Sequence, residues 1–584
     1  MTPAPDGDER GAHSAIDAHV GAAMARAWGG LSPISLTLAY TDWLLHLLSS
    51  PGSQARLTQQ ALTQAGEWMT DAVRSAGAPR AEPAPTPLGQ AVAADARFAD
   101  PTWQQWPWHG LAAASKAWEG WWNSASQLRG MQDHSREQMR FYGQQVLDAF
   151  SPSNWLATNP QALQAAWQSG GTSLLKGMGH AVDELRLRHG LEPLHSRAAD
   201  PSPGHGLAMT PGRVVMRNAL IELIQYLPTT TRVQRTPLLI VPSCIMKFHI
   251  LDLTPETSMV RWLVAQGHTV YIVSWRNPDE SDALLSMDDY VRDGVLAALD
   301  HVQRATHEPV HLCGYCLGGT FAAIAAAALG GAGNGCLKSL TLLAAETDFT
   351  EPGEMGVLID EAQVRLLEDM MAAQGFLTGQ QMAGSFQFLH SRELVWSSRT
   401  KRWLLGEDEV GNELMVWNAD VTRLPAVMHS EYLRRCFLNN DLAEGRFPFE
   451  DDPISLRDIR VPVFGVGTLK DHVAPWRSCY KMHRLVSGPV TFALTNGGHN
   501  AGIVSEPGHQ GRYHHLLNTP PEQPWRTPEE WQAAAPRVEG SWWQSWHEWL
   551  LVQGTPETVP ARGVPADPAL GDAPGRYMLV RYGD

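Results

Sequence analysis

A tight turn between an apolar strand and a small-residue helix constrains this chain more than any other feature. The turn reads Gly314-Tyr315-Cys316-Leu317-Gly318, a G-x-C-x-G pattern with a possible nucleophile between two glycines. A Cβ atom at either glycine would clash with the adjoining strand or helix, so the pattern predicts one sharp strand-to-helix turn. Cys316 would begin the helix, where the helix dipole favours a thiolate, and the Leu317 N–H would point toward a developing oxyanion.

Two other interpretations of this turn stay open on the sequence alone. Cys313 and Cys316 form a C-x-x-C pair, which is the spacing of thioredoxin-like redox sites. Cys313 would then lie inside the strand, however, and the two glycines would have no purpose. Alternatively, Cys316 is an unreactive core cysteine in a glycine-rich turn. The position of the glycines favours a nucleophile over both interpretations.

An acid and a histidine follow the cysteine in the order that α/β-hydrolases use, which is nucleophile, acid, histidine. Asp471 comes directly after the apolar run 461–470, and His499 follows the next apolar run, 490–496. Side chains at the carboxyl ends of neighbouring parallel strands meet at one edge of a sheet. Taken singly, Asp471 could be a helix cap, and His499 is one of 23 histidines. Together and in this order, they predict a catalytic triad with Cys316.

The alternation of predicted strands and helices indicates the fold class. From residue 213 to 584 short apolar runs alternate with helical stretches, which predicts an α/β-hydrolase fold with a doubly wound, mostly parallel sheet. A stretch at about 348–458 interrupts the alternation, and we expect it to form a cap over the active site. Residues 1–212 predict a helical N-terminal domain with a flexible N-terminus and a Pro/Ala-rich linker near 76–87.

Composition argues against several kinds of partner. Lys and Arg number 45 against 61 Asp and Glu, a formal charge of −16, and no basic block is present, so we expect no nucleic-acid partner. Six cysteines in 584 residues argue against a disulfide framework and for a reducing cytoplasm. The small-residue run 320–331 is too short to span a bilayer, and we expect no signal peptide, membrane span or metal site. We expect most of the 23 tryptophans in the core, the alternative being an apolar interaction surface.

A cysteine at this position favours acyl transfer over hydrolysis. An incoming thioester exchanges for an enzyme thioester at almost no change in free energy, and the acyl group stays activated for attack by an alcohol. The turn and its two partners therefore predict an acyltransferase that accepts an acyl group from CoA.

Long segments outside the turn resemble the polyhydroxyalkanoate synthase family, of the single-chain class I type. The likeness runs from about residue 96 to 577, and a further segment, GLSPISLTLAYTDWLLHLLSSPG, occurs in only part of the family. The segments that carry the resemblance are RFADPTWQQWP, RNALIELIQYLP, ILDLTPETSMVRWLVAQGHTVYIVSWRNPD, WNADVTRLP, LKDHVAPW, GSWWQSWHEWL and APGRY. The resemblance implies that (R)-3-hydroxyacyl-CoA is polymerised to a polyester with release of CoA. It assigns Cys316 as nucleophile, His499 as base, and Asp471, directly or through His499, to activation of the 3-hydroxyl.

The resemblance also implies where the protein acts and with what. The CoA thioester is the substrate, and no cofactor is needed. The expected location is the cytoplasm at polyester granules, with the granule surface and granule-associated proteins as partners and a homodimer as the assembly.

One loop departs from the family pattern. Where the family usually has P-P-x-x-N-K-Y-Y-I, residues 242–250 read PSCIMKFHI, so that Met246, Phe248 and His249 replace an Asn and a Tyr pair. We expect this loop to supply a second oxyanion N–H, from Cys244 or Ile245, and to line the acyl pocket. The replacements therefore bear on which acyl groups are preferred.

Two alternatives of different kinds stay open. Dienelactone hydrolases share the G-Y-C-L-G-G turn and a Cys–Asp–His triad, but they are much shorter and lack the helical N-terminal region and the Trp-rich tail. A non-catalytic granule or scaffold protein with the same fold would show the loss of Cys316, Asp471 or His499, and all three are present.

Overall fold

The structure is a computed structural model that describes residues 7–77, 86–189, 191–194, 201–408 and 413–580. Most of the predicted Pro/Ala linker near 76–87, and the first residues of the predicted flexible N-terminus, lie outside these ranges. The chain divides into two compact units, a sheet unit formed by 1–31, 200–383 and 411–584 and a helical unit formed by 32–199 and 384–410. Within the described ranges, none of the helices has the length and apolar character that crossing a membrane requires.

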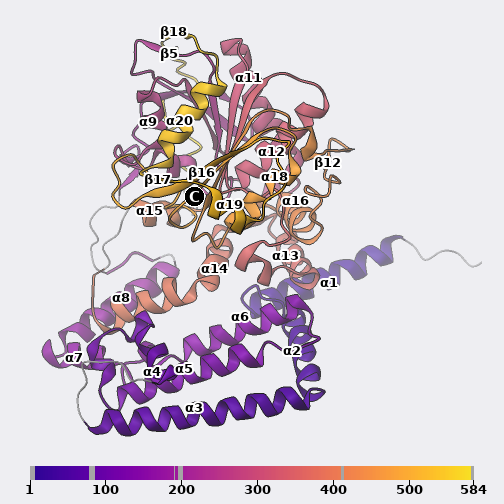
Figure 1. The fold of residues 1–584 in the computed structure, drawn as a ribbon. Helices are drawn as coiled ribbons and strands as arrows, with labels where there is room; N and C mark the ends of the chain where they lie inside the picture. Colours follow the sequence, from indigo (N-terminus) through magenta and orange to yellow (C-terminus); the bar gives the residue numbers. More distant parts are fainter. Residues whose placement is uncertain (1–6, 78–85, 190, 195–200, 409–412, 581–584) are drawn as a thin grey trace, which may run out of the picture. The chain divides into compact units, whose positions relative to one another are not determined.

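The sheet unit is built on one ten-stranded sheet in the order β17-β16-β15-β14-β9-β8-β6-β7-β4-β3 (Figure 1). The six strands from β15 to β7 are parallel to their neighbours, and the two strands at each end are antiparallel. Their bounds are β3 Gly212–Arg217, β4 Ile221–Tyr226, β6 Leu238–Val241, β7 Val270–Trp275, β8 Val310–Tyr315, β9 Leu337–Leu343, β14 Val463–Thr468, β15 Val490–Thr495, β16 Tyr513–Thr519 and β17 Arg537–Glu539. The predicted fold class is confirmed.

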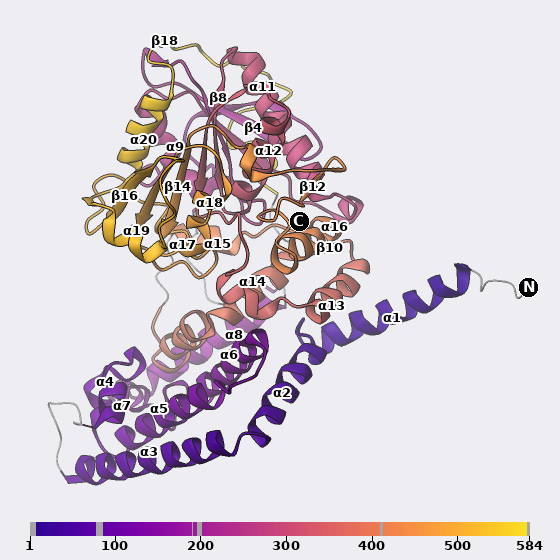
Figure 2. The same ribbon diagram turned by 45° about the vertical axis from the view of Figure 1, so that its right-hand side comes forward.

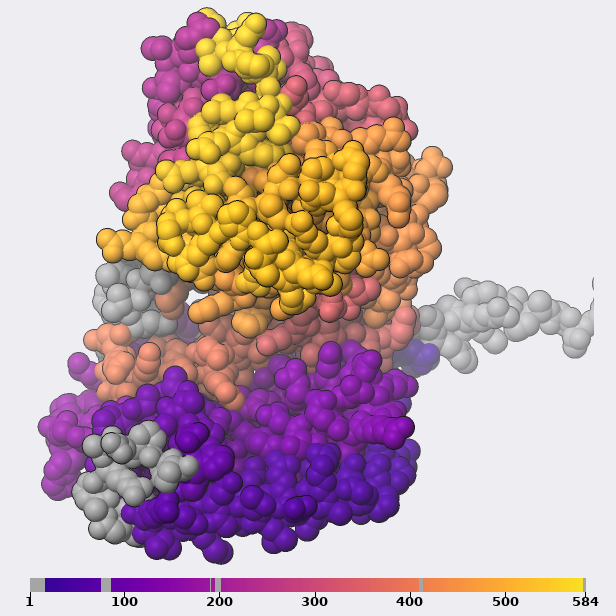
Figure 3. Space-filling view, in the orientation of Figure 1, coloured from indigo at the N-terminus to yellow at the C-terminus, as the bar shows by residue number. Residues whose placement is uncertain are grey.

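Helices cover both faces of the sheet (Figure 2). Helices α9 (Met259–Ala265) and α20 (Trp542–Gln553) lie on one face, where the Trp262 and Trp543 rings are 5.7 Å apart, and α11 (Ala297–Thr306) and α12 (Leu317–Gly331) lie on the other. Every α12 residue from Leu317 to Ala327 is buried, as expected for a helix that has apolar or small residues on all sides. The C-terminal residues, yellow in Figure 3, spread over one face of the sheet unit.

Tryptophans near the C-terminus are part of the core of the sheet unit. Trp542, Trp543 and Trp546 in α20 are fully buried, as expected for most of the tryptophans. Many other tryptophans do not follow this expectation. More than half of the surface is exposed in Trp28, Trp106, Trp118, Trp155 and Trp167.

The helical unit consists of α-helices joined by short turns. Its described helices are α2 Pro33–Leu48, α3 Pro51–Gly77, α4 Pro87–Ala93, α5 Trp108–Ala125, α6 Asp133–Ala149, α7 Pro160–Gln168 and α8 Thr172–Arg188. Side-chain caps set the starts of several of them, for example Ser32 before α2 and Asn159 before α7. The Arg97 guanidinium binds Asp95, Glu119 and Asp148 at 2.7, 2.6 and 3.1 Å and so joins distant parts of the unit.

The stretch predicted as a cap, about 348–458, is shared between the two units. Residues 384–408 pack in the helical unit, where Arg392 binds Asp148 at 2.6 Å. The remainder belongs to the sheet unit and includes α13 (Glu361–Ala372), α16 (Ala426–Glu431) and the π-helical turn η10 (Tyr432–Leu438). Helix α1 (Gly7–Ala27) packs closely on α13. An added Cβ at Gly21 would lie only 2.2 Å from Oδ2 of Asp369 in α13.

Candidate active site

Cys316 is the single residue between β8 and α12, and it has a backbone conformation that few residues adopt. Its φ is 54° and its ψ is −129°, a strained combination that the turn imposes. An added Cβ at Gly314 would lie 2.4 Å from the Cα of Gly319, and one at Gly318 would lie 2.3 Å from the carbonyl oxygens of Val241 and Pro242. Neither position has room for any residue but glycine, which is the physical reason for the G-x-C-x-G pattern.

Cys313, the other half of the C-x-x-C pair, lies inside β8 and is fully buried. Burial raises the pKa of its thiol far above the ordinary range, which opposes the thiolate that a redox cysteine needs. Cys316, in contrast, is partly exposed at the end of the strand. The two sulfurs therefore occupy different environments.

Asp471 follows β14 and is held by four hydrogen bonds. Its Oδ1 accepts from the backbone N–H groups of Val473 and Ala474 at 2.9 and 2.8 Å. Its Oδ2 lies 2.8 Å from Nδ1 of His499 and 3.2 Å from Oγ1 of Thr468. Burial alone would raise the pKa of Asp471, but the His499 charge and these hydrogen bonds lower it below its usual value. The Asp471 side chain is 0% exposed.

His499 connects the acid to the thiol. Burial lowers the pKa of His499, but the charges of Asp471 and Cys316 and the hydrogen bond to Asp471 outweigh burial and raise it well above the ordinary value. The His499 side chain is 13% exposed, so it is open to a substrate where Asp471 is not. The structure thus brings the three predicted triad residues together at the carboxyl edge of the parallel strands.

Two further groups of contacts position His499. The Tyr315 ring stacks on the imidazole with centroids 5.6 Å apart, and its hydroxyl donates to Oδ1 of Asn500 at 2.5 Å. The indole N–H groups of Trp542 and Trp543 donate to backbone carbonyls in the loop that follows His499. Neither role is evident from the sequence, although Tyr315 lies inside the motif itself.

The three residues predicted to bind the oxyanion lie beside the thiol or in the loop after β6. Leu317 is the first residue of α12, where backbone N–H groups have no partner within the helix. Cys244 is buried, and burial together with the nearby Cys316 charge raises the pKa of its thiol. The Ile245 N–H donates to Oγ of Ser243 at 3.2 Å, so it is already used within the loop.

Residues near 420 and the C-terminus fix the loop after β6. Nε1 of Trp417 donates to the Lys247 carbonyl at 2.8 Å, and the Thr422 hydroxyl donates to the Cys244 carbonyl. Nζ of Lys247 binds Asp420 at 2.8 Å and the Met578 carbonyl at 2.8 Å. The WNADVTRLP segment and the residues after APGRY therefore hold the loop beside the thiol.

The residues by which this loop departs from the family pattern belong mainly to the core. Phe248 is 2% and His249 is 1% exposed, while Met246 is partly buried against the same core. Burial lowers the pKa of His249 to about 3, with Lys247 contributing, so its imidazole is neutral. His249 thus fills space as an uncharged ring.

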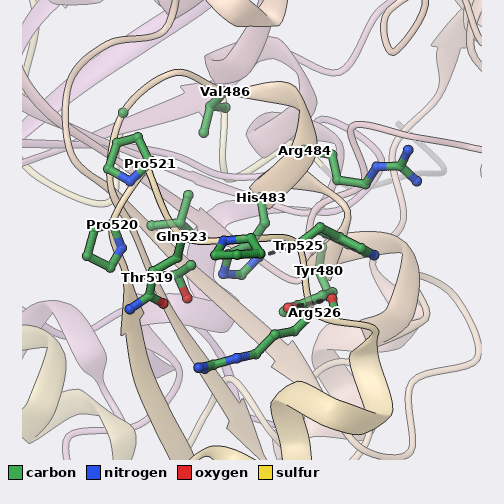
Figure 4. A pocket seen from close by; sticks show the side chains of 13 residues that line it. Tyr480, His483, Arg484, Val486, Thr519, Pro520, Pro521, Gln523, Trp525 and Arg526 are labelled. Carbon is green, nitrogen blue, oxygen red and sulfur yellow. Dashed lines mark hydrogen bonds between the residues drawn. The ribbon is translucent and has the colours of Figure 1, made fainter.

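A surface cavity of about 260 Å³ lies away from the triad (Figure 4). It is lined on one side by Tyr480 and His483 and on the other by the segment 519–526. Val490, the first residue of β15, also lines it, whereas His499 follows the last residue of that strand. The cavity is therefore at the opposite edge of the sheet from the chemistry.

Three family models match this chain. One described as the poly-beta-hydroxybutyrate polymerase (PhaC) N-terminus matches residues 94–263, and one described as the poly-beta-hydroxybutyrate polymerase N terminal matches residues 11–53. A third, described as the alpha/beta hydrolase fold, matches residues 237–506, a range that includes the turn, Asp471 and His499.

Curated relatives match over most of their lengths. Poly(3-hydroxyalkanoate) polymerase of Methylorubrum extorquens is 38% identical over 94% of this chain and 89% of its own. The poly(3-hydroxyalkanoate) polymerase subunit PhaC of Rhizobium meliloti is 36% identical over 83% of this chain and 80% of its own. The subunit of the same name from Cupriavidus necator is 37% identical over 76% of this chain and 76% of its own.

Proposed function

Because the chain belongs to the poly(3-hydroxyalkanoate) polymerase family, we propose that it polymerises 3-hydroxyacyl-CoA through an acyl thioester on Cys316. The observation that carries the proposal is the Cys316–His499–Asp471 arrangement at the strand-to-helix turn. A hydrolase of the dienelactone type is not favoured, since polymerase relatives match 94% of the chain, including the helical region that such hydrolases lack.

The first half-reaction loads the enzyme. His499 takes the Cys316 proton, and the thiolate sulfur attacks the thioester carbonyl of the incoming 3-hydroxyacyl-CoA. We assign the N–H groups of Leu317 and Cys244 as donors to the oxyanion that forms. The bond from the carbonyl carbon to the CoA sulfur breaks, and CoA leaves with the proton that His499 held.

The second half-reaction extends the chain. A 3-hydroxyl group, from the next unit or from the chain end, attacks the Cys316 thioester while His499 takes its proton. An ester bond forms, and the Cys316 sulfur leaves and recovers its proton from His499. Asp471 acts through His499, because one of its oxygens is bonded to the imidazole and the other accepts two backbone N–H groups. Asp471 fixes the imidazole orientation and stabilises its positive charge.

The part of the insert at about 348–458 that belongs to the sheet unit is proposed to cover the Cys316 thiol. Burial raises the pKa of the Tyr432 phenol in η10, and the Cys316 charge nearby contributes to the same shift. A covered site keeps water from an acyl thioester that must wait for an alcohol.

Contact with the polyester granule is proposed for the helical unit. It exposes large apolar side chains, among them Leu62 at 70%, Trp167 at 88% and Leu175 at 65%. Such side chains suit an apolar polymer surface. The homodimer and the cytoplasmic location implied by the resemblance stay predictions, which light scattering and fluorescence microscopy of a tagged chain test directly.

The experiment for the proposal traps the acyl-enzyme. After brief mixing with 3-hydroxybutyryl-CoA and acid quench, mass spectrometry should locate the hydroxyacyl group on the peptide containing Cys316. Cys316→Ala should abolish both the adduct and CoA release. Cys313→Ala is the matched control, since it changes only packing inside β8 and should leave substantial activity. The redox interpretation would be restored by two results together: equal loss of activity in both variants, and a wild-type activity that depends on reductant.

A further inference from the structure

A second buried carboxyl group lies at the active site, and the mechanism above does not use it. Glu346 follows β9 by three residues and is 5% exposed. Its carbonyl accepts a hydrogen bond from Oγ1 of Thr320, one turn along α12 from Cys316, at 3.0 Å. The adjacent Ala345 touches the same helix, because an added Cβ at Gly319 would lie 2.4 Å from the Ala345 Cβ. The backbone around Glu346 is thus fastened to the turn that carries the thiol.

The surroundings of the Glu346 carboxyl favour its uncharged form. Burial, followed by the charges of Asp471 and Cys316, raises its pKa well above the ordinary value, and His499 and Lys481 oppose this only in part. Further titratable groups around it are Tyr432, Cys436 and Cys479. An uncharged carboxyl group has one O–H donor, which a carboxylate lacks.

One oxygen of this carboxyl group is left without a partner. Among the residues that the structure describes, Oε1 of Glu346 is buried and makes no hydrogen bond. Buried polar atoms nearly always have partners, because leaving one unpaired costs free energy. A partner supplied by the substrate would account for a buried acid retained beside the nucleophile.

We infer that Glu346 binds the 3-oxygen of the acyl group carried on Cys316. This inference rests on the proposed function. The 3-oxygen is a hydroxyl in a newly loaded unit and an ester oxygen in a growing chain. Both accept a hydrogen bond from a carboxylic acid, whereas a carboxylate would find no donor on the ester oxygen. An uncharged acid therefore suits both forms that the acyl group takes during polymerisation.

The test compares two substrates that differ only at that oxygen. Single-turnover CoA release is measured with 3-hydroxybutyryl-CoA and with butyryl-CoA, and their rate ratio is the readout. In Glu346→Leu the ratio should fall at least about tenfold, since a site built to bind a hydroxyl loses preference when its partner is removed. Glu346→Gln can still donate a hydrogen bond and should keep most of the preference. Thr347→Val, at the buried neighbouring residue, is the matched control and should leave the ratio unchanged.

A pH series keeps the test decisive if the leucine variant fails to fold. In the wild type the ratio should fall as pH rises and Glu346 ionises, whereas in Glu346→Gln it should stay flat. Titration of Cys316 or His499 changes both substrates alike and cancels in the ratio. Equal slowing of both substrates in Glu346→Leu, or identical pH series for wild type and Glu346→Gln, would overturn the inference. Failure of the wild type to release CoA from the hydroxyacyl substrate would instead refute the proposed function.

Discussion

Replacing Asp471 by Asn tests how the acid takes part in catalysis. Oδ1 of Asp471 accepts two backbone N–H groups, so the Asn oxygen must stay there. The amide nitrogen then takes the place of Oδ2 and presents a donor to Nδ1 of His499, which is 2.8 Å away in the wild type. Nδ1 must become an acceptor, so the proton of the neutral ring moves to Nε2. His499 would then present an N–H to Cys316 instead of a lone pair.

The size of the loss follows from that geometry. A base in the wrong tautomer forfeits general base catalysis, which is typically worth about 10²–10⁴-fold. This corresponds to a barrier higher by about 3–5 kcal/mol. Because His499 serves both half-reactions, acylation and elongation should fall together.

The assay follows CoA release by rapid quench and polymer by turbidity in the same reaction. Asp360→Asn is the control, because Asp360 caps α13 and Asn caps helices equally well. A burst of CoA near one equivalent per site without elongation would show that Asp471 acts on the 3-hydroxyl itself. Activity within about tenfold of wild type would refute the dependence of His499 on Asp471.

Three further predictions follow from the packing and from the charges. Gly318→Ala puts a Cβ 2.3 Å from the Pro242 carbonyl oxygen and should lower the free energy of unfolding by about 1–3 kcal/mol in urea titrations; an unchanged midpoint would contradict the turn geometry. Folding raises the pKa of Glu346, so the folded state binds more protons than the unfolded state. The free energy of unfolding of the wild type should therefore fall relative to that of Glu346→Gln as the pH rises above about 4.3. The expected slope is about 1.4 kcal/mol per pH unit until the folded pKa is reached. If the difference in free energy of unfolding between wild type and Glu346→Gln is the same at pH 5 and pH 7, Glu346 is not held neutral. A cap formed by the insert at about 348–458 predicts a lag in turnover that shortens with substrate, oligomer primer or enzyme concentration; a linear time course at every concentration would count against it.

The central strands and the placement of Cys316, Asp471 and His499 at their carboxyl ends could be predicted because the signals are local. The glycines around Cys316 reflect a steric limit that any chain making this turn must meet. Runs such as those of β14 and β15 are apolar because both faces of the strand are buried, and the residue after each run is placed at the carboxyl edge. Asp471 and His499 follow from that rule together with their order after Cys316 in the chain.

The features that escaped prediction depend on contacts between distant residues. The edge strand β17 is exposed along its length and has no apolar run to reveal it. Residues 384–408 join the helical unit through packing that no local sequence pattern indicates. Nothing in the sequence around Glu346 distinguishes a buried, unpartnered acid from a surface one. The stacking of Tyr315 on His499 joins two segments far apart in the chain.

The most direct test of the proposed function is an analysis of products from purified enzyme and 3-hydroxybutyryl-CoA, with Cys316→Ala as control. CoA and acyl products are quantified together. The proposal predicts that nearly all of the acyl groups matching the released CoA are recovered in ester-linked polymer, and that the variant releases none. Recovery of free 3-hydroxybutyrate in amounts equal to the CoA would identify a hydrolase and contradict the proposal.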